Sequence, residues 1–183
     1  DIVVGFCRKK RLWGVNRLSP ACYRKLLIKG RYNISATCGK LFRRTLFDEY
    51  TLRTPREIVM GEDMLMNLRL AFASSKPVRL VGGNSVYNYI QHGGNITHVF
   101  KLTADYEHIF HKERLLSIPE EEHARYMPVM IYRRLRMLRR ILRCAQKDNT
   151  VEELRTSAFV KELLADIHAT RYTFWRYPHW RLW

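Results

Sequence analysis

The sequence predicts an α+β fold, in the form of an α/β fragment with a small mixed sheet, a hairpin and flanking helices, followed by a C-terminal helical extension. Short apolar runs bounded by turn residues, at 2–6, 78–81 and 86–90, indicate the strands. Apolar residues recur at three- and four-residue steps across 62–74, which indicates an amphipathic helix. Helical patterns then continue from about residue 101 onwards.

Length and composition fit this organisation and exclude several classes of protein. The 183 residues are 46% hydrophobic and 12% aromatic, which is typical of globular chains and excludes wholesale disorder. We expect a first domain at residues 1–102 and a basic, aromatic helical extension at 103–183. No apolar stretch reaches the roughly 18 residues of a membrane-spanning helix, and no signal peptide is visible. We therefore expect a cytoplasmic protein, either free or peripheral on the inner face of the membrane.

Local signals predict each element of the first domain. The apolar run at 2–6 predicts a strand, and Ser19 followed by proline predicts a helix start with a stop at Gly30. Residues 40–50 predict a strand or turn that runs into a short helix. Thr54 precedes a proline, which disfavours helical conformation at that position and predicts a turn.

The next helix opens with two acids. Gly61 is followed by Glu62 and Asp63, and the partial positive charge of a helix start favours ionised carboxylates there. An ionised, positioned carboxylate is what a general base requires. Acids at helix starts are also common capping and dipole devices, so the pair alone does not indicate catalysis. The apolar face of this helix contains Leu65, Leu68 and Phe72.

Glycine-rich segments and further helix starts follow. Gly-Gly-Asn at 82–84, between apolar runs, supplies the positive-φ residues of a tight hairpin turn. His-Gly-Gly-Asn at 92–95 predicts a loop. Helix starts are expected at 103–106, 119–122 and 151–154.

Several motifs occur in an order that carries a family resemblance. They are Gly-Lys-Leu-Phe-Arg-Arg at 39–44, Gly-Glu-Asp at 61–63, Tyr-Asn-Tyr at 87–89 and Asn-Ile-Thr-His at 95–98. From about residue 1 to 106, the chain resembles the bacterial family-2 type inverting glycosyltransferases of GT-A fold, which build capsular and other surface polysaccharides. One departure is Asn95, where that family more often has serine.

A second departure concerns the donor side of the fold. The family begins with a nucleotide-binding half that ends in an Asp-x-Asp metal motif, and this sequence contains no Asp-x-Asp. Residues 1–5 resemble the strand that the family places just beyond that motif. The resemblance therefore implies the acceptor-side, C-terminal part of a glycosyltransferase, which we expect to be inactive alone. The complete enzyme would use a divalent metal, Mg²⁺ or Mn²⁺, whose main ligands are missing here.

The resemblance also implies roles for particular residues. Asp63 would take the proton of the acceptor hydroxyl as general base, and Glu62 would orient substrate or backbone. The substrates would be a nucleotide-sugar donor and a saccharide or lipid-linked acceptor. For Glu62, a solvated position at the helix start is an equal alternative.

Donor phosphates would be bound by cationic and loop residues. Thr97 and His98 fall in the loop that closes over the donor diphosphate in the family, and His98 would ligate metal or donate to phosphate; a histidine without a role is the alternative. Lys40, Arg43 and Arg44 would bind phosphate or acceptor, because guanidinium groups match phosphate oxygens. The alternative is solvated surface charge, which we favour for Arg44.

Other metal and disulfide signals are weak. The cysteines form no Cys-x-x-Cys pair, which argues against a zinc ribbon or redox motif and favours free thiols. His108 and His111 fall on one helix face, but a zinc site with His92 and His98 would lack nearby cysteines or a closed ligand set. The cysteines are Cys7, Cys22, Cys38 and Cys144.

The formal net charge of +16 implies a polyanionic partner. Residues 125–147 predict an amphipathic helix, and residues 172–183 are rich in tryptophan, tyrosine and arginine, which suits a membrane interface. We expect attachment to an anionic membrane; packing of the aromatics on a missing half or on a second subunit is the alternative. The apolar stripe is Met127, Ile131, Leu135, Leu138 and Leu142, and the basic stripe is Arg133, Arg136, Arg140, Arg143 and Lys147.

Two other classes of function compete with the glycosyltransferase. A basic, non-enzymatic module that binds nucleic acid is compatible with the charge, but no helix-turn-helix, zinc finger or stacking-strand motif appears. A structural oligomerisation domain would be indifferent to replacement of Asp63 in a reconstituted full-length enzyme. Donor sugar, acceptor and linkage do not follow from kinship of fold.

Overall fold

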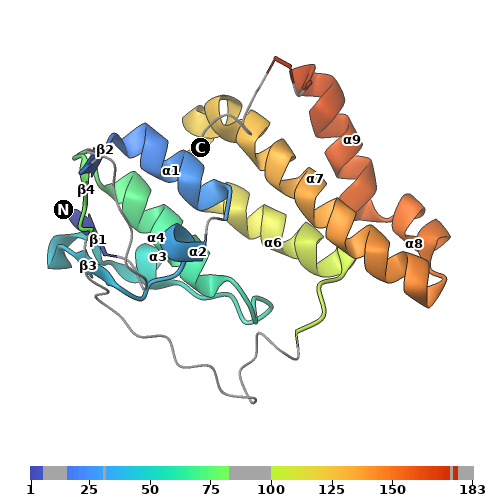
Figure 1. The fold of residues 1–183 in the computed structure, drawn as a ribbon, viewed down its shortest axis with the longest axis horizontal. Coiled ribbons are helices and arrows are strands. Elements are labelled where there is room, and N and C mark those ends of the chain that lie inside the picture. The colour runs from blue at the N-terminus through green and yellow to red at the C-terminus, as the bar shows by residue number, and fades with distance from the viewer. Residues whose placement is uncertain (6–15, 31, 83–99, 174, 177–183) are drawn as a thin grey trace. The chain divides into compact units, whose positions relative to one another are not determined.

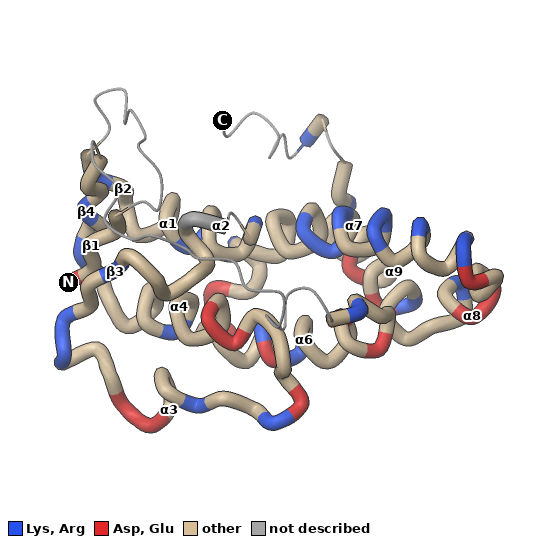
Figure 2. The backbone as a smooth tube through the Cα atoms, turned by 60° about the horizontal axis from the view of Figure 1, so that its bottom comes forward, with Lys and Arg blue, Asp and Glu red and all other residues tan. Residues whose placement is uncertain are grey.

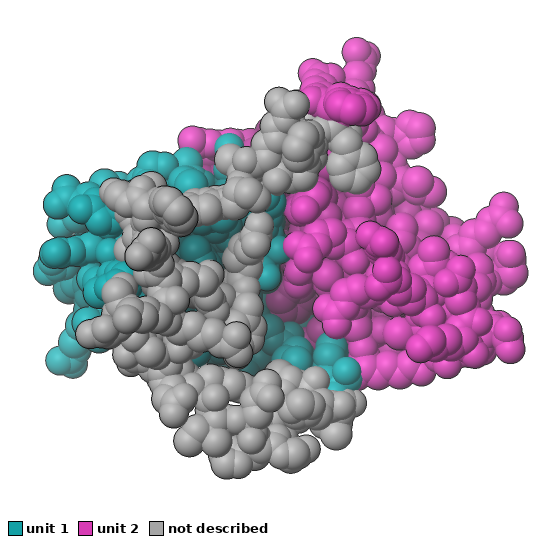
Figure 3. Space-filling view, in the orientation of Figure 1, with its two compact units in different colours: residues 1–100 teal, residues 101–183 magenta. Residues whose placement is uncertain are grey.

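The computed structural model describes residues 1–5, 16–30, 32–82, 100–173 and 175–176. The chain forms two compact units, unit 1 (Asp1–Phe100) and unit 2 (Lys101–Trp183), which are considered separately (Figure 3). The predicted α+β class is confirmed by a small mixed sheet with flanking helices. The predicted hairpin return at 86–90 and the loop at 92–95 lie outside the described residues.

The described strands of unit 1 form one mixed sheet in the order β2-β4-β1-β3 (Figure 1). β1 pairs parallel with β4 and antiparallel with β3, and β2 pairs antiparallel with β4. Val4, the last residue of β1, lies opposite Lys40 of β3 and beside Leu80 of β4. This register places the start of β3 and the end of β4 at the carboxyl end of β1. The strands are β1 (Ile2–Val4), β2 (Arg17–Leu18), β3 (Lys40–Phe42) and β4 (Val78–Leu80).

Two helices, α1 (Pro20–Ile28) and α4 (Glu62–Ala73), pack side by side in unit 1. The predicted start of α1 is confirmed, because the Ser19 side chain accepts from the Cys22 N–H at 3.2 Å. Arg24 on α1 donates to the carbonyls of Ala71 (3.0 Å) and Ser74 (3.1 Å) and so closes the C-terminal end of α4. The shorter elements are α2 (Tyr32–Ser35), the 3₁₀ turn η1 (Arg44–Leu46) and α3 (Glu49–Leu52).

Unit 2 is helical over its described residues, and α6, α7 and α9 pack against one another in pairs. Its core contains Ile131 and Ile141 of α7 and Phe159 and Leu163 of α9. All five residues of the predicted apolar stripe lie in this core or against it, so that prediction is confirmed. The elements are α6 (Ala104–Leu116), the 3₁₀ turn η2 (Glu120–Glu122), α7 (His123–Asp148), α8 (Val151–Thr156) and α9 (Ala158–Thr170).

Candidate functional site

The N-terminus of α4 has the geometry that the sequence predicts. Gly61 is the N-cap residue in a left-handed conformation (φ 92°), which glycine adopts without steric cost. Its carbonyl accepts from the Met64 N–H at 2.9 Å and starts the helix. Glu62 and Asp63 therefore lie in the first turn, where unpaired backbone N–H groups and the helix dipole give a positive potential.

The carboxylate of Asp63 is held from one side. Its Oδ1 accepts a hydrogen bond from Thr37 Oγ1 at 2.9 Å, and the side chain is half-buried. Among the residues that the structure describes, its Oδ2 accepts no hydrogen bond and joins no ion pair. The arrangement fixes the carboxylate by one oxygen and leaves the other able to accept a proton.

The segment that carries Thr37 is tied to α4 by a buried amide. Asn67 Nδ2 donates to the carbonyl of Asp63 at 2.8 Å and to that of Ser35 at 2.7 Å, and the Asn67 side chain is fully buried. These bonds hold the C-terminal end of α2, and with it the loop that contains Thr37, against the first turn of α4. Sequence reasoning did not single out Thr37 or Asn67, and no motif marks either residue.

This loop lies at the carboxyl ends of two parallel strands. The Gly5 N–H donates to the Gly39 carbonyl at 2.8 Å just after β1, and the Val81 N–H donates to the Val4 carbonyl at 2.9 Å just after β4. Asp63 is linked to the same end of the sheet through its hydrogen bond with Thr37. In open α/β sheets, ligands bind outside the carboxyl ends of the strands.

The other predicted site residues are placed differently. Glu62 is exposed. Lys40 starts β3 at the end of the sheet that is close to Asp63, and its Nζ is shielded from solvent. Arg43 follows β3 at the opposite end of the strands, where its Nε donates to Asp1 Oδ1 at 2.8 Å. The structure therefore does not bring Arg43 to Asp63. Thr97 and His98 lie outside the described residues.

The described residues do not by themselves fit a divalent metal. Within the described ranges, no three His, Cys, Asp or Glu side chains gather closely enough to hold an ion.

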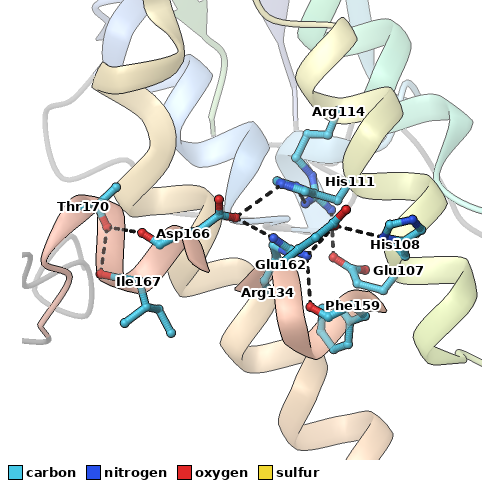
Figure 4. Close-up of polar contacts among 10 residues, drawn as sticks. All are labelled: Glu107, His108, His111, Arg114, Arg134, Phe159, Glu162, Asp166, Ile167 and Thr170. Atoms are coloured by element: carbon cyan, nitrogen blue, oxygen red, sulfur yellow. Dashed lines mark hydrogen bonds and ion pairs between the residues drawn. The ribbon is translucent and has the colours of Figure 1, made fainter. Parts of the chain in front are cut away.

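Unit 2 contains a second polar constellation, which we call the buried arginine network (Figure 4). It connects α6, α7 and α9 through side chains that face one another between the helices. Sequence reasoning did not predict it. Its members are Glu107, His108, His111, Arg114, Arg134, Glu162 and Asp166.

Two fully buried guanidinium groups form the centre of the network. Arg114 donates to Glu107 Oε1 at 3.2 Å, and both side chains are buried. Arg134 donates to Asp166 Oδ2 at 2.6 Å and to Glu162 Oε2 at 3.3 Å. Since buried charges are costly unless they are paired, these carboxylates are needed to keep the arginines inside.

Two histidines of α6 contact members of this network. His108 Nδ1 lies 2.9 Å from Glu162 Oε2. His111 Nδ1 lies 3.3 Å from the Arg114 guanidinium, which can only donate, so this nitrogen is the acceptor. Burial, and then the charges of Arg114 and Arg134, lowers the pKa of His111 to about 2. The two histidines do share a face, as predicted, but their partners are carboxylates and an arginine.

The neutral state of His111 predicts a pH dependence of stability. In the unfolded chain its imidazole takes up a proton at about pH 6.5, whereas in the folded chain its pKa is about 2. Below about pH 6.5 the unfolded state therefore binds more protons, and stability is lost as the pH falls. We expect the free energy of unfolding to fall by up to ~1.4 kcal/mol per pH unit between about pH 6 and 5.

Denaturant titrations at several pH values would measure this slope. His111→Gln should flatten it, whereas His168→Gln, which removes an exposed histidine of α9, should leave it intact. An unchanged slope in His111→Gln would contradict the prediction.

Comparisons with known proteins leave the motif resemblance as a prediction. No protein-family model, no curated protein and no solved structure matches this chain. Over the described residues, every helix is too short or too polar to cross a membrane.

Proposed function

We propose that this chain is the acceptor-side part of an inverting, nucleotide-sugar-dependent glycosyltransferase of surface polysaccharide synthesis, and that Asp63 is its general base. The geometry of Asp63 is the main support. Its carboxylate sits in the first turn of α4, at the carboxyl ends of β1 and β4, with Oδ1 held by Thr37 and Oδ2 without a hydrogen-bond partner in the described part of the chain. The order of the Gly-Lys-Leu-Phe-Arg-Arg and Gly-Glu-Asp motifs gives independent support.

The proposed step is an in-line displacement at the anomeric carbon of the donor sugar. The oxygen of the acceptor hydroxyl forms a bond to this carbon while the bond to the nucleotide diphosphate breaks, and the leaving group takes that electron pair. Asp63 Oδ2 accepts the hydroxyl proton as the new bond forms. Thr37 contributes by fixing the orientation of the carboxylate, since its hydroxyl donates a hydrogen bond to Oδ1 and not to the oxygen that would accept the proton.

The leaving diphosphate needs cationic or hydrogen-bonding partners. We assign this task to Thr97, His98 and residues of the donor-binding half. Lys40 is not included: although it starts β3 near Asp63, its Nζ is shielded from solvent. Arg43 is not among the proposed phosphate ligands, because it pairs with Asp1 at the opposite end of the strands. We place the reaction in the cytoplasm.

The test is a transfer assay with and without the sequence encoded upstream of Asp1. The extended protein should transfer label from one of a panel of nucleotide sugars to a saccharide or lipid-linked acceptor, and the product should have inverted anomeric configuration. The chain from Asp1 to Trp183 alone should show no transfer. Retained configuration, or no transfer by the extended protein with any donor, would overturn the proposal.

A further inference from the structure

The second half of α7 presents a row of cations to solvent. Five exposed residues over 136–147 are cationic, and their spacing places them within an arc of about 100° on one side of the helix, over a length of ~17 Å. Figure 2 shows how Lys and Arg follow one another along α7. We call this surface the α7 basic face: Arg136, Arg139, Arg140, Arg143 and Lys147.

No acidic side chain neutralises this face within the described residues. The only acid of α7 is its last residue, Asp148, and that carboxylate pairs with Lys101 at 2.7 Å. None of the five cations forms an ion pair in the described part of the chain, whereas Arg125 and Arg155 elsewhere in unit 2 each pair with a nearby glutamate.

Such a row of like charges works against the helix that carries it. Like charges three or four residues apart destabilise a helix, and Arg136, Arg140 and Arg143 follow this spacing. The buried arginine network does not explain them, since it uses Arg134 and not the exposed positions. A partner with dense negative charge would turn the repulsion into a favourable interaction.

The shape of unit 2 distinguishes between anionic partners. α7 packs against α6, α8 and α9, so it lies along the unit and does not project from it. A helix of about 10–12 Å diameter fits the DNA major groove, about 12 Å wide, where it protrudes from the surface of its domain. A face that lies along the unit suits a plane of phosphates instead, and guanidinium groups match phosphate oxygens well.

An exposed tryptophan in the same unit favours a lipid plane. The Trp175 side chain is 86% exposed. Three residues before it, Tyr172 packs in the core with Ile131 of α7. Tryptophan prefers the boundary between headgroups and acyl chains. We propose that the α7 basic face binds the surface of an anionic lipid bilayer. This proposal does not depend on Asp63 or on sugar transfer.

Vesicle sedimentation tests the proposal with the purified chain. Vesicles of phosphatidylcholine alone are compared with vesicles that also contain anionic phosphatidylglycerol, at low and at high salt. We expect binding only to the anionic vesicles, and weaker binding at high salt because salt screens exposed charges. Equal binding to both compositions, or no binding to either, would overturn the proposal.

Two triple variants with the same net charge locate the surface. Arg136→Gln, Arg140→Gln and Arg143→Gln together should lower the partition coefficient by about 100-fold, at about fivefold for each cation near the leaflet. The control replaces three exposed cations elsewhere, Lys112, Lys161 and Arg56, with glutamine and should bind within about threefold of the original chain. Equal losses in both variants would show that net charge alone acts and would overturn the assignment to α7.

Two further arms cover the remaining outcomes. The corresponding Arg→Lys triple variant keeps the charge and should keep binding. If the triple glutamine variant fails to fold, the single variants Arg140→Gln and Arg143→Gln replace it, and each should lower the partition coefficient by about fivefold. Duplex DNA and RNA are titrated under the same salt conditions. Tighter binding to a duplex than to anionic vesicles, with the same dependence on these arginines, would overturn the lipid proposal in favour of nucleic acid.

Discussion

Asparagine in place of Asp63 is expected to lower kcat of the complete, extended enzyme by about 10³-fold, within the range of 10²–10⁴ typical of a general base. Asparagine has nearly the same shape, and its amide oxygen can still accept the hydrogen bond from Thr37 that holds Oδ1 at 2.9 Å. It cannot accept the proton of the acceptor hydroxyl. We therefore expect KM for both substrates to change little, and steady-state kinetics would measure the two parameters separately.

Three companion variants make this result specific. Asp63→Ala should lose the same activity and also about 1 kcal/mol of stability, because the Thr37 hydroxyl loses its acceptor. Glu57→Gln removes an exposed acid in the segment before α4 and should leave kcat unchanged. Glu62→Gln tests the neighbour of the base. If Asp63→Asn kept more than about a tenth of the activity, a general-base role would be excluded.

The elements that the sequence predicts well are those with local signals. Ser19 caps α1 through its own neighbour three residues on, and Gly61 permits the left-handed backbone that opens α4. Such signals depend on a few adjacent residues, so they can be identified without the fold. β2 spans two residues and exists only because it pairs with β4, more than fifty residues further along the chain. No local pattern predicts a strand of that kind.

The candidate site shows the same division. The position of Asp63 in the first turn follows from the Gly-Glu-Asp motif and helical spacing. Its anchors do not, because the Thr37 bond spans 26 positions and the bond from Asn67 to Ser35 spans 32. The engagement of Arg43 with Asp1 likewise follows from antiparallel pairing of β1 and β3 and not from the motif that contains Arg43.

The arginines of α7 differ in environment although they share one sequence pattern. Spacing predicts a solvated basic stripe, and Arg136, Arg140 and Arg143 are indeed exposed. Arg133 is half-buried, and burial together with the charge of Arg114 lowers its pKa to about 10. Arg134 is fully buried because α9 places Glu162 and Asp166 beside it. A buried arginine was not predicted, since its partners come from a helix whose packing the sequence does not specify.

The fully buried pair of Glu107 and Arg114 gives the largest stability prediction. Glu107→Leu should lower the free energy of unfolding by about 3–5 kcal/mol, because it leaves the Arg114 guanidinium buried without its carboxylate partner. Replacing both residues, with Glu107→Leu and Arg114→Met, should cost much less, because apolar side chains of similar volume carry no desolvation penalty. Chemical denaturation of the four proteins in this double-mutant cycle would measure the coupling. Glu121→Leu, at an exposed position in η2, should change stability by no more than about 0.5 kcal/mol. If the losses of the two single variants simply added in the double variant, Glu107 and Arg114 would not act as a coupled buried pair.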